Sequence, residues 1–132
     1  MNIPDGFGTV TPYFFVKDAD GFASFLVKVF DGTEVLRTTR PDGRIANVQV
    51  RIGTSTLMAS EAGGAYPPMP CACYLYVEDA DASMRRAMAE GATLEMAVAD
   101  MPYGDRQGGV RDAWGNLWWI SQRLVSAPYG PG

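Results

Sequence analysis

Two similar stretches decide the fold: YFFVKDAD at residues 13–20 and YLYVEDAD at residues 74–81. They lie 61 residues apart and share five of their eight residues. The same offset pairs Pro41 with Pro102, Gly43 with Gly104, and Ser60 with Ser121. A fixed period over so much of a chain indicates a duplicated unit. We place the two units at residues 9–61 and 70–123 of one domain, and we expect the Pro- and Gly-rich tail, residues 124–132, to be flexible.

Length and composition describe an ordinary globular domain. The chain has 132 residues, of which 47% are hydrophobic and 20% are charged, so it is long enough to bury a core. The net charge of −4 and the scattered cations argue against a nucleic-acid partner. No apolar run approaches the length of a membrane helix, and MNIPDGFGTV does not resemble a signal peptide. We therefore expect a cytoplasmic protein without a membrane or nucleic-acid partner.

Histidine is absent from the chain. This excludes a Ser-His-Asp or Cys-His catalytic centre, an imidazole general base and any zinc site that contains His. Any catalysis would have to use carboxylates, Tyr, Cys, Lys or Arg. The two cysteines, Cys71 and Cys73, share one face of a strand and would strain to form a disulfide. We interpret them as two small buried thiols, with a soft-metal or redox pair as the alternative.

Each unit has the same order of predicted elements. Residues 10–16 and 71–77 are short apolar runs typical of strands. Asp18 or Asp20, and Asp79 or Asp81, are good caps for helices that would end at Gly32 and Gly91. Turn residues then divide further strands, which we place at 33–39, 44–52 and 55–60 in the first unit and at 93–97, 108–111 and 117–121 in the second. The pattern is β-α-β-β-β twice, which predicts an α+β fold with a curved mixed sheet.

This order and three motifs resemble the vicinal oxygen chelate superfamily, which includes glyoxalase I, extradiol dioxygenases and bleomycin resistance proteins. The motifs are TPYFFVKDAD (11–20), GRIANVQVRIG (43–53) and YGDRQGGVRDAWGNLWWIS (103–121), and together they are similar to the PhnB-like (demethylubiquinone-methyltransferase-like) branch. The resemblance covers nearly the whole chain. It implies curved half-barrels that form a cup and pair in a homodimer, and it leaves open whether one chain or two complete the cup.

The resemblance also implies where a metal would bind. The metalloenzymes of the superfamily carry one ligand on the first and one on the last strand of each unit, at the positions held here by Thr11, Met58, Ala72 and Trp119. The PhnB-like branch often carries His where this chain has Asn47 and Asn116. These residues do not supply the hard donors that a divalent metal needs, so we expect no metal and no cofactor. A different site built from acidic residues is the alternative, with the candidates Glu61, Glu78, Glu95, Asp105 and Asp112.

Strand alternation predicts which side chains line the cup. We expect Val10, Phe14 and Val16 to face the helices, and likewise Cys71, Cys73, Leu75 and Val77. The residues expected on the opposite, concave face are Tyr13, Phe15, Asn47, Gln49, Arg51, Met58, Tyr74, Tyr76 and Trp119. Tyr103 and Arg106 belong to a loop that would reach over the mouth of the cup, unless residues 103–116 are only a hairpin with turns at Asp112 and Gly115.

An aromatic cup with a few polar groups and one cation is typical of a small-molecule site. Aromatic faces suit planar or cationic ligands, and Arg51 suits a carboxylate or phosphate. The main hypothesis is a metal-independent protein that sequesters or carries such a ligand. The alternatives are an enzyme (a lyase, isomerase or dioxygenase with a non-standard or absent metal, or an acid–base catalyst using Tyr13, Tyr74 or Glu61), a dimeric scaffold without a ligand, and aromatic residues that only pack a core or a dimer interface.

Overall fold

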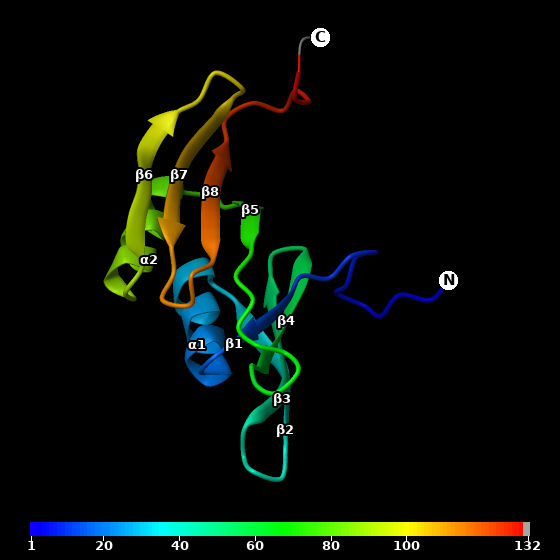
Figure 1. Ribbon diagram of the computed structural model, residues 1–132. Coiled ribbons are helices and arrows are strands. Elements are labelled where there is room, and N and C mark those ends of the chain that lie inside the picture. The colour runs from blue at the N-terminus through cyan, green and yellow to red at the C-terminus, as the bar shows by residue number, and fades with distance from the viewer. Residues whose placement is uncertain (131–132) are drawn as a thin grey trace. The chain divides into compact units, whose positions relative to one another are not determined.

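The structure, a computed structural model, describes residues 1–130. The chain forms two compact units, Met1–Pro70 and a second that begins at Cys71 (Figure 1). Each unit contains one helix and one four-stranded sheet. The predicted βαβββ order is therefore confirmed in both units.

The first unit contains, in order, β1 (Tyr13–Val16), α1 (Ala19–Phe30), β2 (Thr33–Thr39), β3 (Ile45–Ile52) and β4 (Ser55–Glu61). The strands lie in the order β1-β4-β3-β2. β1 runs parallel to β4, while β4–β3 and β3–β2 are antiparallel hairpins. The sheet is thus open and mixed, as predicted, because the first strand returns to the last strand rather than to its neighbour in sequence.

The second unit repeats this topology with β5 (Ala72–Tyr76), α2 (Ala80–Ala89), β6 (Thr93–Asp100), β7 (Asp105–Arg111) and β8 (Leu117–Arg123). The strand order is β5-β8-β7-β6, again with a parallel first pair. The two units also pair equivalent residues across their parallel strands. Tyr13 lies opposite Met58, and their counterparts 61 residues later, Tyr74 and Trp119, lie opposite each other in the same way.

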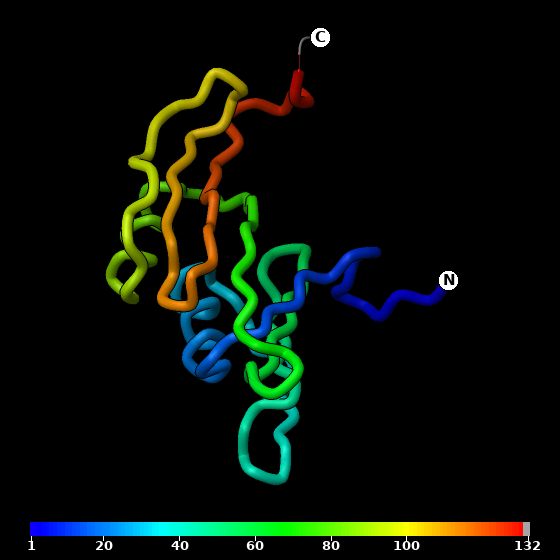
Figure 2. The backbone as a smooth tube through the Cα atoms, in the orientation of Figure 1, coloured from blue at the N-terminus to red at the C-terminus, as the bar shows by residue number. Residues whose placement is uncertain are grey.

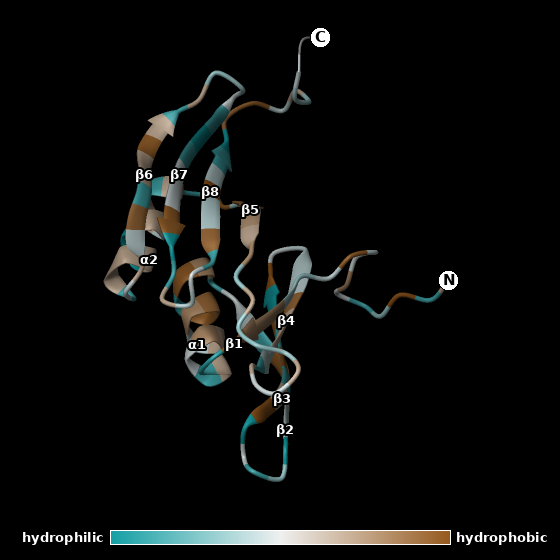
Figure 3. Cartoon of the chain, in the orientation of Figure 1, coloured by the Kyte–Doolittle hydropathy of each residue, from teal (hydrophilic) through white to brown (hydrophobic). Residues whose placement is uncertain are grey.

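Each helix packs on one face of its own sheet. α1 lies on β3 and β4, and α2 lies on β6, β7 and β8. The helical spacing of Phe22, Leu26 and Val29 predicts an apolar stripe on α1, because residues three and four apart share one face of a helix. These three residues are at most 2% exposed. Figure 3 shows α1 mostly in hydrophobic colours and α2 paler, in agreement with the fewer buried apolar residues of α2. The opposite surface of each sheet carries no helix of its own unit, and we call it the helix-free face.

The last strand of each unit supplies an acceptor to the start of its helix. Both carboxylate oxygens of Glu61 accept hydrogen bonds, from the backbone N–H groups of Asp18 (2.8 Å) and Ala19 (2.9 Å). Gln122, the residue 61 positions later, accepts from the N–H of Ala80 (3.0 Å). The first N–H groups of a helix have no partner within the helix, so these side chains fasten the helix to the sheet.

Strand ends differ from the prediction at several places. β1 begins at Tyr13 rather than at Val10, whose side chain is 83% exposed. Pro12, directly before the strand, has no backbone N–H to donate to the sheet. β7 begins at Asp105 rather than at Gly108, and β8 continues to Arg123. The cysteines were expected to be buried, but Cys71 is exposed and Cys73 is half-buried. Within residues 1–130, neither helix has the length and apolar character needed to cross a membrane.

Candidate functional site

The helix-free face of the second unit is lined by aromatic side chains. Along β8, Trp118 and Ile120 are buried toward the helix, so the alternate residues Trp119 and Ser121 lie on the other face. Two adjacent glycines in β7 show the same division. A Cβ on Gly108 would meet the side chain of Met84 in α2, whereas a Cβ on Gly109 would lie 2.6 Å from Cζ3 of Trp119. The indole of Trp119 therefore lies directly against the backbone of β7.

A buried carboxylate lies at one end of this face. The side chain of Asp105, at the start of β7, is fully buried. Its Oδ2 accepts hydrogen bonds from the hydroxyls of Tyr74 (2.5 Å) and Tyr129 (2.6 Å), and its Oδ1 accepts one from Nη1 of Arg123 (3.0 Å). Burial of an ionised carboxylate requires such compensation. Asp105 thus fixes two phenols and one guanidinium in place.

These contacts move the pKa values of the cluster away from neutrality. Burial alone would raise the pKa of Asp105, but the hydrogen bonds from Tyr129, Tyr74 and Arg123 outweigh it and hold the pKa below its usual value. Desolvation and the hydrogen bond to Asp105 raise the pKa of both Tyr74 and Tyr129. Asp105 is therefore a stable acceptor and the two phenols are stable donors. None of the three groups has its pKa moved toward neutrality, where a general acid or base would need it.

A second layer of polar groups continues from this cluster. Ser121 is fully buried and accepts from Nε2 of Gln107 (2.8 Å). The hydroxyl of Tyr103, in the β6–β7 turn, donates to Oε1 of Gln107. Within the described residues, no buried side-chain nitrogen or oxygen lacks a hydrogen-bond partner. The network therefore positions the aromatic rings without leaving an unsatisfied polar group beneath them.

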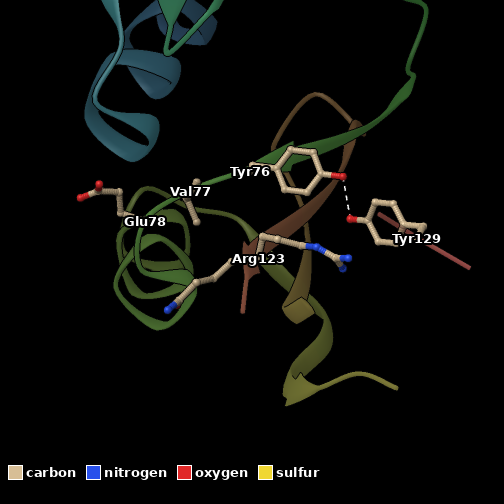
Figure 4. A pocket seen from close by; sticks show the side chains of 6 residues that line it. Tyr76, Val77, Glu78, Arg123 and Tyr129 are labelled. Carbon is tan, nitrogen blue, oxygen red and sulfur yellow. Dashed lines mark hydrogen bonds between the residues drawn. The ribbon is translucent and has the colours of Figure 1, made fainter. Parts of the chain in front are cut away.

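The C-terminal segment turns back onto this face. In Figure 2 it leaves the end of β8 beside the β6–β7 turn, where the N–H of Leu124 donates to the carbonyl of Gly104 (2.9 Å). The ring of Tyr129 then lies over the guanidinium of Arg123, 4.2 Å from Cζ to the ring centre. Figure 4 shows the hollow beside it, and Tyr76 and Tyr129 joined there by a hydrogen bond of 2.6 Å. The hollow is lined by Tyr76, Val77, Glu78, Gln122, Arg123 and Tyr129.

The tail that we expected to be flexible is therefore seated through residue 129, while residues 131 and 132 lie outside the described part of the chain. Arg123 holds the segment at a second point, because its Nη2 donates to the carbonyl of Ala127 (2.6 Å).

The first unit carries a separate aromatic group on its helix-free face. Phe15 stacks on Tyr13, with ring centres 5.0 Å apart, and on Tyr66, at 5.3 Å. The Tyr13 hydroxyl hydrogen-bonds to Ser60 (2.5 Å), whose own hydroxyl donates to the carbonyl of Ala46. Tyr13 and Ser60 are the counterparts of Tyr74 and Ser121. At the position of Asp105, however, the first unit has the exposed Arg44, so the buried carboxylate is a feature of the second unit.

The remaining predicted residues of the first unit fall into two places. Gln49 lies opposite Met58, which lies opposite Tyr13, and Nε2 of Gln49 donates to Oδ1 of Asn47 (3.0 Å). These residues and Phe15 form one surface. Arg51 lies apart at the far end of β3, where its Nε donates to the carbonyl of Gly53 (3.3 Å) and the N-terminal segment passes beside it at Gly6.

The second unit brings Tyr74, Tyr76, Tyr103 and Trp119 to its helix-free face, but not Arg106. The guanidinium of Arg106 lies on the helix side, where it pairs with Asp81 of α2 (2.8 Å) and with Asp100 (2.9 Å). The prediction treated residue 106 as part of a loop, whereas it lies within β7, and alternation along that strand turns it toward the helix. Arg106 thus fastens α2 rather than reaching over a ligand.

Several acidic and amide residues that we considered as ligands or catalysts have structural partners. Glu61 starts α1, as described above. Asp112 closes the β7–β8 hairpin, as the turn interpretation predicted, by accepting from the backbone N–H groups of Trp114 and Asn116 and from Nε1 of Trp118 (2.8 Å). Asn116 is itself buried, and its Oδ1 accepts from the N–H of Cys71 (3.0 Å). Glu95 forms an ion pair with Arg111 (3.1 Å).

The donors at the expected metal positions do not fit a divalent metal. Ala72 has no donor atom, Trp119 offers an N–H and a ring, Met58 offers a thioether and Thr11 only a neutral hydroxyl. Hard divalent cations require carboxylate or carbonyl oxygens, and transition metals favour imidazole or thiolate. Within residues 1–130, no three Cys, Asp or Glu side chains gather in a way that would hold a metal ion. We therefore derive no chemistry through a metal at this site.

Sequence reasoning missed the most connected residues of the second unit, namely Gln107, Ser121, Arg123 and Tyr129. It considered Asp105 only as an alternative metal ligand. One signal was available, because the 61-residue offset aligns Asp105 with Arg44 and so marks a charge reversal between the units. Tyr129 gave none beyond being an aromatic residue in a Pro- and Gly-rich tail.

Comparison with known proteins shows extensive similarity. The family model described as the Glyoxalase/Bleomycin resistance protein/Dioxygenase superfamily matches residues 6–120. An uncharacterized protein of Mycobacterium bovis, Mb0911c, is 34% identical over 124 residues, which cover 86% of this chain and 82% of that protein.

Solved structures share the fold. TioX from Micromonospora sp. ML1 superimposes with a TM-score of 0.72 at 27% identity, covering 89% of this chain and 100% of that one. The PhnB protein from Bacillus cereus gives 0.70 at 16% identity, covering 87% and 99%. TnmS3, an antibiotic binding protein from Streptomyces sp. CB03234, gives 0.66 at 22% identity, covering 93% and 98%.

Proposed function

We propose that this chain, which belongs to the Glyoxalase/Bleomycin resistance protein/Dioxygenase superfamily, binds a planar or cationic small molecule without a metal and does not transform it. The observation that carries the proposal is the aromatic helix-free face of the second unit. Tyr74, Tyr76 and Tyr103 are each 43–55% exposed there. Exposed aromatic side chains fixed by a buried polar network are costly for a surface that binds nothing.

The rings are held in place before a ligand arrives. The indole of Trp119 lies against the backbone at Gly109, and the hydroxyl of Tyr74 is fixed by Asp105. Rigid aromatic side chains lose little conformational entropy on binding, and their π-faces attract flat or cationic groups. The structural similarity to TnmS3, described as an antibiotic binding protein, supports the same class of function.

The alternative is an enzyme, and no contact described for residues 71–130 favours it. A general base or acid must change protonation near the working pH. The pKa of Asp105 is lowered and the pKa values of Tyr74 and Tyr129 are raised, so all three lie further from neutrality. In the first unit, both carboxylate oxygens of Glu61 already accept hydrogen bonds from backbone N–H groups at the start of α1. Binding without chemistry is therefore the function that these residues serve best.

The proposal is tested by titrating the protein with acridine orange, a planar cation, and with bleomycin, following heat release by calorimetry and tryptophan fluorescence in parallel. We expect Trp119→Ala to weaken the binding of a bound probe by about tenfold, the order of one aromatic contact with its buried area. Trp114→Ala is the matched control, because Trp114 lies in the β7–β8 hairpin, and it should leave the affinity unchanged.

If wild type and Trp119→Ala bound a probe with equal affinity, the helix-free face of the second unit would not be the binding site, and the proposal would be wrong on this point. Absence of binding by both probes would contradict the ligand class. Elemental analysis of the purified protein completes the test, since one stoichiometric metal per chain would overturn a metal-independent site.

The family resemblance also leads us to propose a homodimer, which sedimentation analysis of the purified protein would test. A monomer over the whole accessible concentration range would contradict it.

A further inference from the structure

The contacts of Tyr129 have the character of a bound ligand rather than of a packed side chain. Its ring is 50% exposed, yet its hydroxyl reaches the fully buried Asp105 at 2.6 Å. The ring face lies over Arg123. The residue is thus recognised by its hydroxyl and its π-face, which are the two features by which a protein recognises a phenol.

The hydroxyl of Tyr129 both donates and accepts. Its single hydrogen is directed at Oδ2 of Asp105, so the 2.6 Å contact with Tyr76 requires the Tyr76 hydroxyl to donate to the Tyr129 oxygen. An occupant of this position must therefore offer one donor and one acceptor on the same atom. A phenolic hydroxyl does so. A carboxylate offers no donor to Asp105 and would be repelled by it, and an ammonium offers no acceptor to Tyr76.

The segment that delivers Tyr129 is otherwise weakly held. Leu124 and Val125 are 47% and 48% exposed, so little apolar area is buried to keep the segment down. Within residues 124–130, its polar anchors are the backbone contact at Gly104, Tyr129 itself and the bond from Arg123 to the carbonyl of Ala127. A segment held at a few polar points exchanges readily with a competitor that reproduces those points.

We propose that Asp105, Tyr76 and Arg123 form a binding site for the hydroxyl of a phenolic small molecule, and that Tyr129 fills this site until such a molecule displaces it. This inference rests on the proposed function and names the chemical group that the helix-free face recognises. The carboxylate that this site requires is present in the second unit, whereas the first unit has the exposed Arg44 at the corresponding position.

The test uses p-cresol, which reproduces the side chain of tyrosine, and toluene, which lacks the hydroxyl. Binding to the full chain is measured by calorimetry or by ligand-observed NMR. We expect Tyr129→Ala to bind p-cresol at least about tenfold more tightly than wild type, because the internal competitor with its charge-assisted hydrogen bond is removed. Toluene should bind at least about tenfold more weakly than p-cresol to the same variant.

Two further variants identify the recognising atoms. In the Tyr129→Ala background, Asp105→Asn should weaken p-cresol binding by about tenfold. Because Asp105 is buried and its replacement is a risk to folding, Tyr76→Phe provides the same test at an exposed position, and we expect a loss of about fivefold. Tyr66→Phe, in the first unit, is the matched control and should change nothing.

The inference is overturned if Tyr129→Ala and wild type bind p-cresol equally, or if toluene and p-cresol bind Tyr129→Ala equally. Its failure is distinct from that of the proposed function. Acridine orange binding that depends on Trp119 but is indifferent to Tyr129 would remove only the phenol site. Tight p-cresol binding to Tyr129→Ala without acridine binding would retain the phenol site and reject the planar-cation ligand.

Discussion

Replacing Asp112 with alanine should destabilise the second unit severely while leaving the first unit intact. The carboxylate accepts four hydrogen bonds, from the backbone N–H groups of Trp114 (2.9 Å) and Asn116 (2.8 Å), from Nδ2 of Asn116 (3.0 Å) and from Nε1 of Trp118 (2.8 Å). Trp118 and Asn116 are each only 1% exposed. Water therefore cannot replace the lost acceptor without entering the core.

The magnitude follows from these donors. A buried donor that loses its partner costs about 1–3 kcal/mol, and Asp112→Ala leaves three such donors on Asn116 and Trp118. Allowing for relaxation of the hairpin, we expect the free energy of unfolding to fall by about 4 kcal/mol, which is a large part of the usual total of about 5–15 kcal/mol. Asp112→Asn keeps one acceptor oxygen and should lose less.

The assay is urea unfolding followed by tryptophan fluorescence. All three tryptophans of the chain, Trp114, Trp118 and Trp119, lie in the second unit, so this signal reports that unit alone. The matched control is Asp42→Ala in the first unit, where the exposed carboxylate accepts a bond from the N–H of Arg44 (2.9 Å); its unfolding is followed by circular dichroism, because the tryptophan signal does not report that unit. A loss below about 1 kcal/mol in Asp112→Ala would refute the argument that these buried donors depend on the carboxylate.

Four further outcomes follow from the same contacts. The pKa of Asp105 is lower in the folded than in the unfolded state. Its contribution to the free energy of unfolding is therefore fully present above about pH 4 and is lost as the pH falls through the folded pKa. The urea midpoint of the wild type should decline in acid more steeply than that of Asp105→Asn. Gly109→Ala places a Cβ 2.6 Å from the indole of Trp119, and we expect a loss of about 1–3 kcal/mol with a shifted emission maximum; an unchanged spectrum would contradict the close contact. Glu61→Ala removes the acceptor of two helix-start N–H groups and should cost about 1 kcal/mol by urea unfolding monitored by circular dichroism, more than Gln122→Ala, which removes one. Burial is the largest cause that raises the pKa of Cys73, and the neighbouring Cys71 raises it further. Burial remains in a Cys71→Ser variant, so iodoacetamide should alkylate the remaining thiol slowly at neutral pH, and rapid labelling would argue against its protection.

The fold was predictable because it depends on patterns that are local and repeated. The stripe of Phe22, Leu26 and Val29 in α1 is visible as helical spacing, and the 61-residue offset carries one unit onto the other. The ends of strands were less predictable. Val10 has a suitable side chain for a strand, and β4 reaches Ser55 at the same level, yet β1 begins only after Pro12, which has no backbone N–H to donate.

The candidate site was predictable only where alternation along a strand decides which way a side chain faces. That rule places Tyr74, Tyr76 and Trp119 correctly on the helix-free face. The rule was not applied to Arg106, because residues 105–107 were assigned to a loop; within β7, alternation turns Arg106 toward the helix. The contact of Asp105 with Tyr129 joins residues 24 positions apart with no periodic pattern between them, so it required the three-dimensional structure.

The parallel pairing of first and last strands has a consequence for how the protein is made. β1 cannot pair until β4 is available, since Tyr13 lies opposite Met58, 45 residues later. β5 likewise cannot pair until β8 is available, over the same interval from Tyr74 to Trp119. During synthesis, therefore, the first sheet can be completed once Glu61 has emerged from the ribosome, before any strand of the second unit has emerged. The second unit finishes later, and Tyr129 reaches Asp105 among its last contacts. The ordering of the duplicated halves along the chain thus separates their folding in time, and it limits the competition between two similar sets of strands for each other's partners.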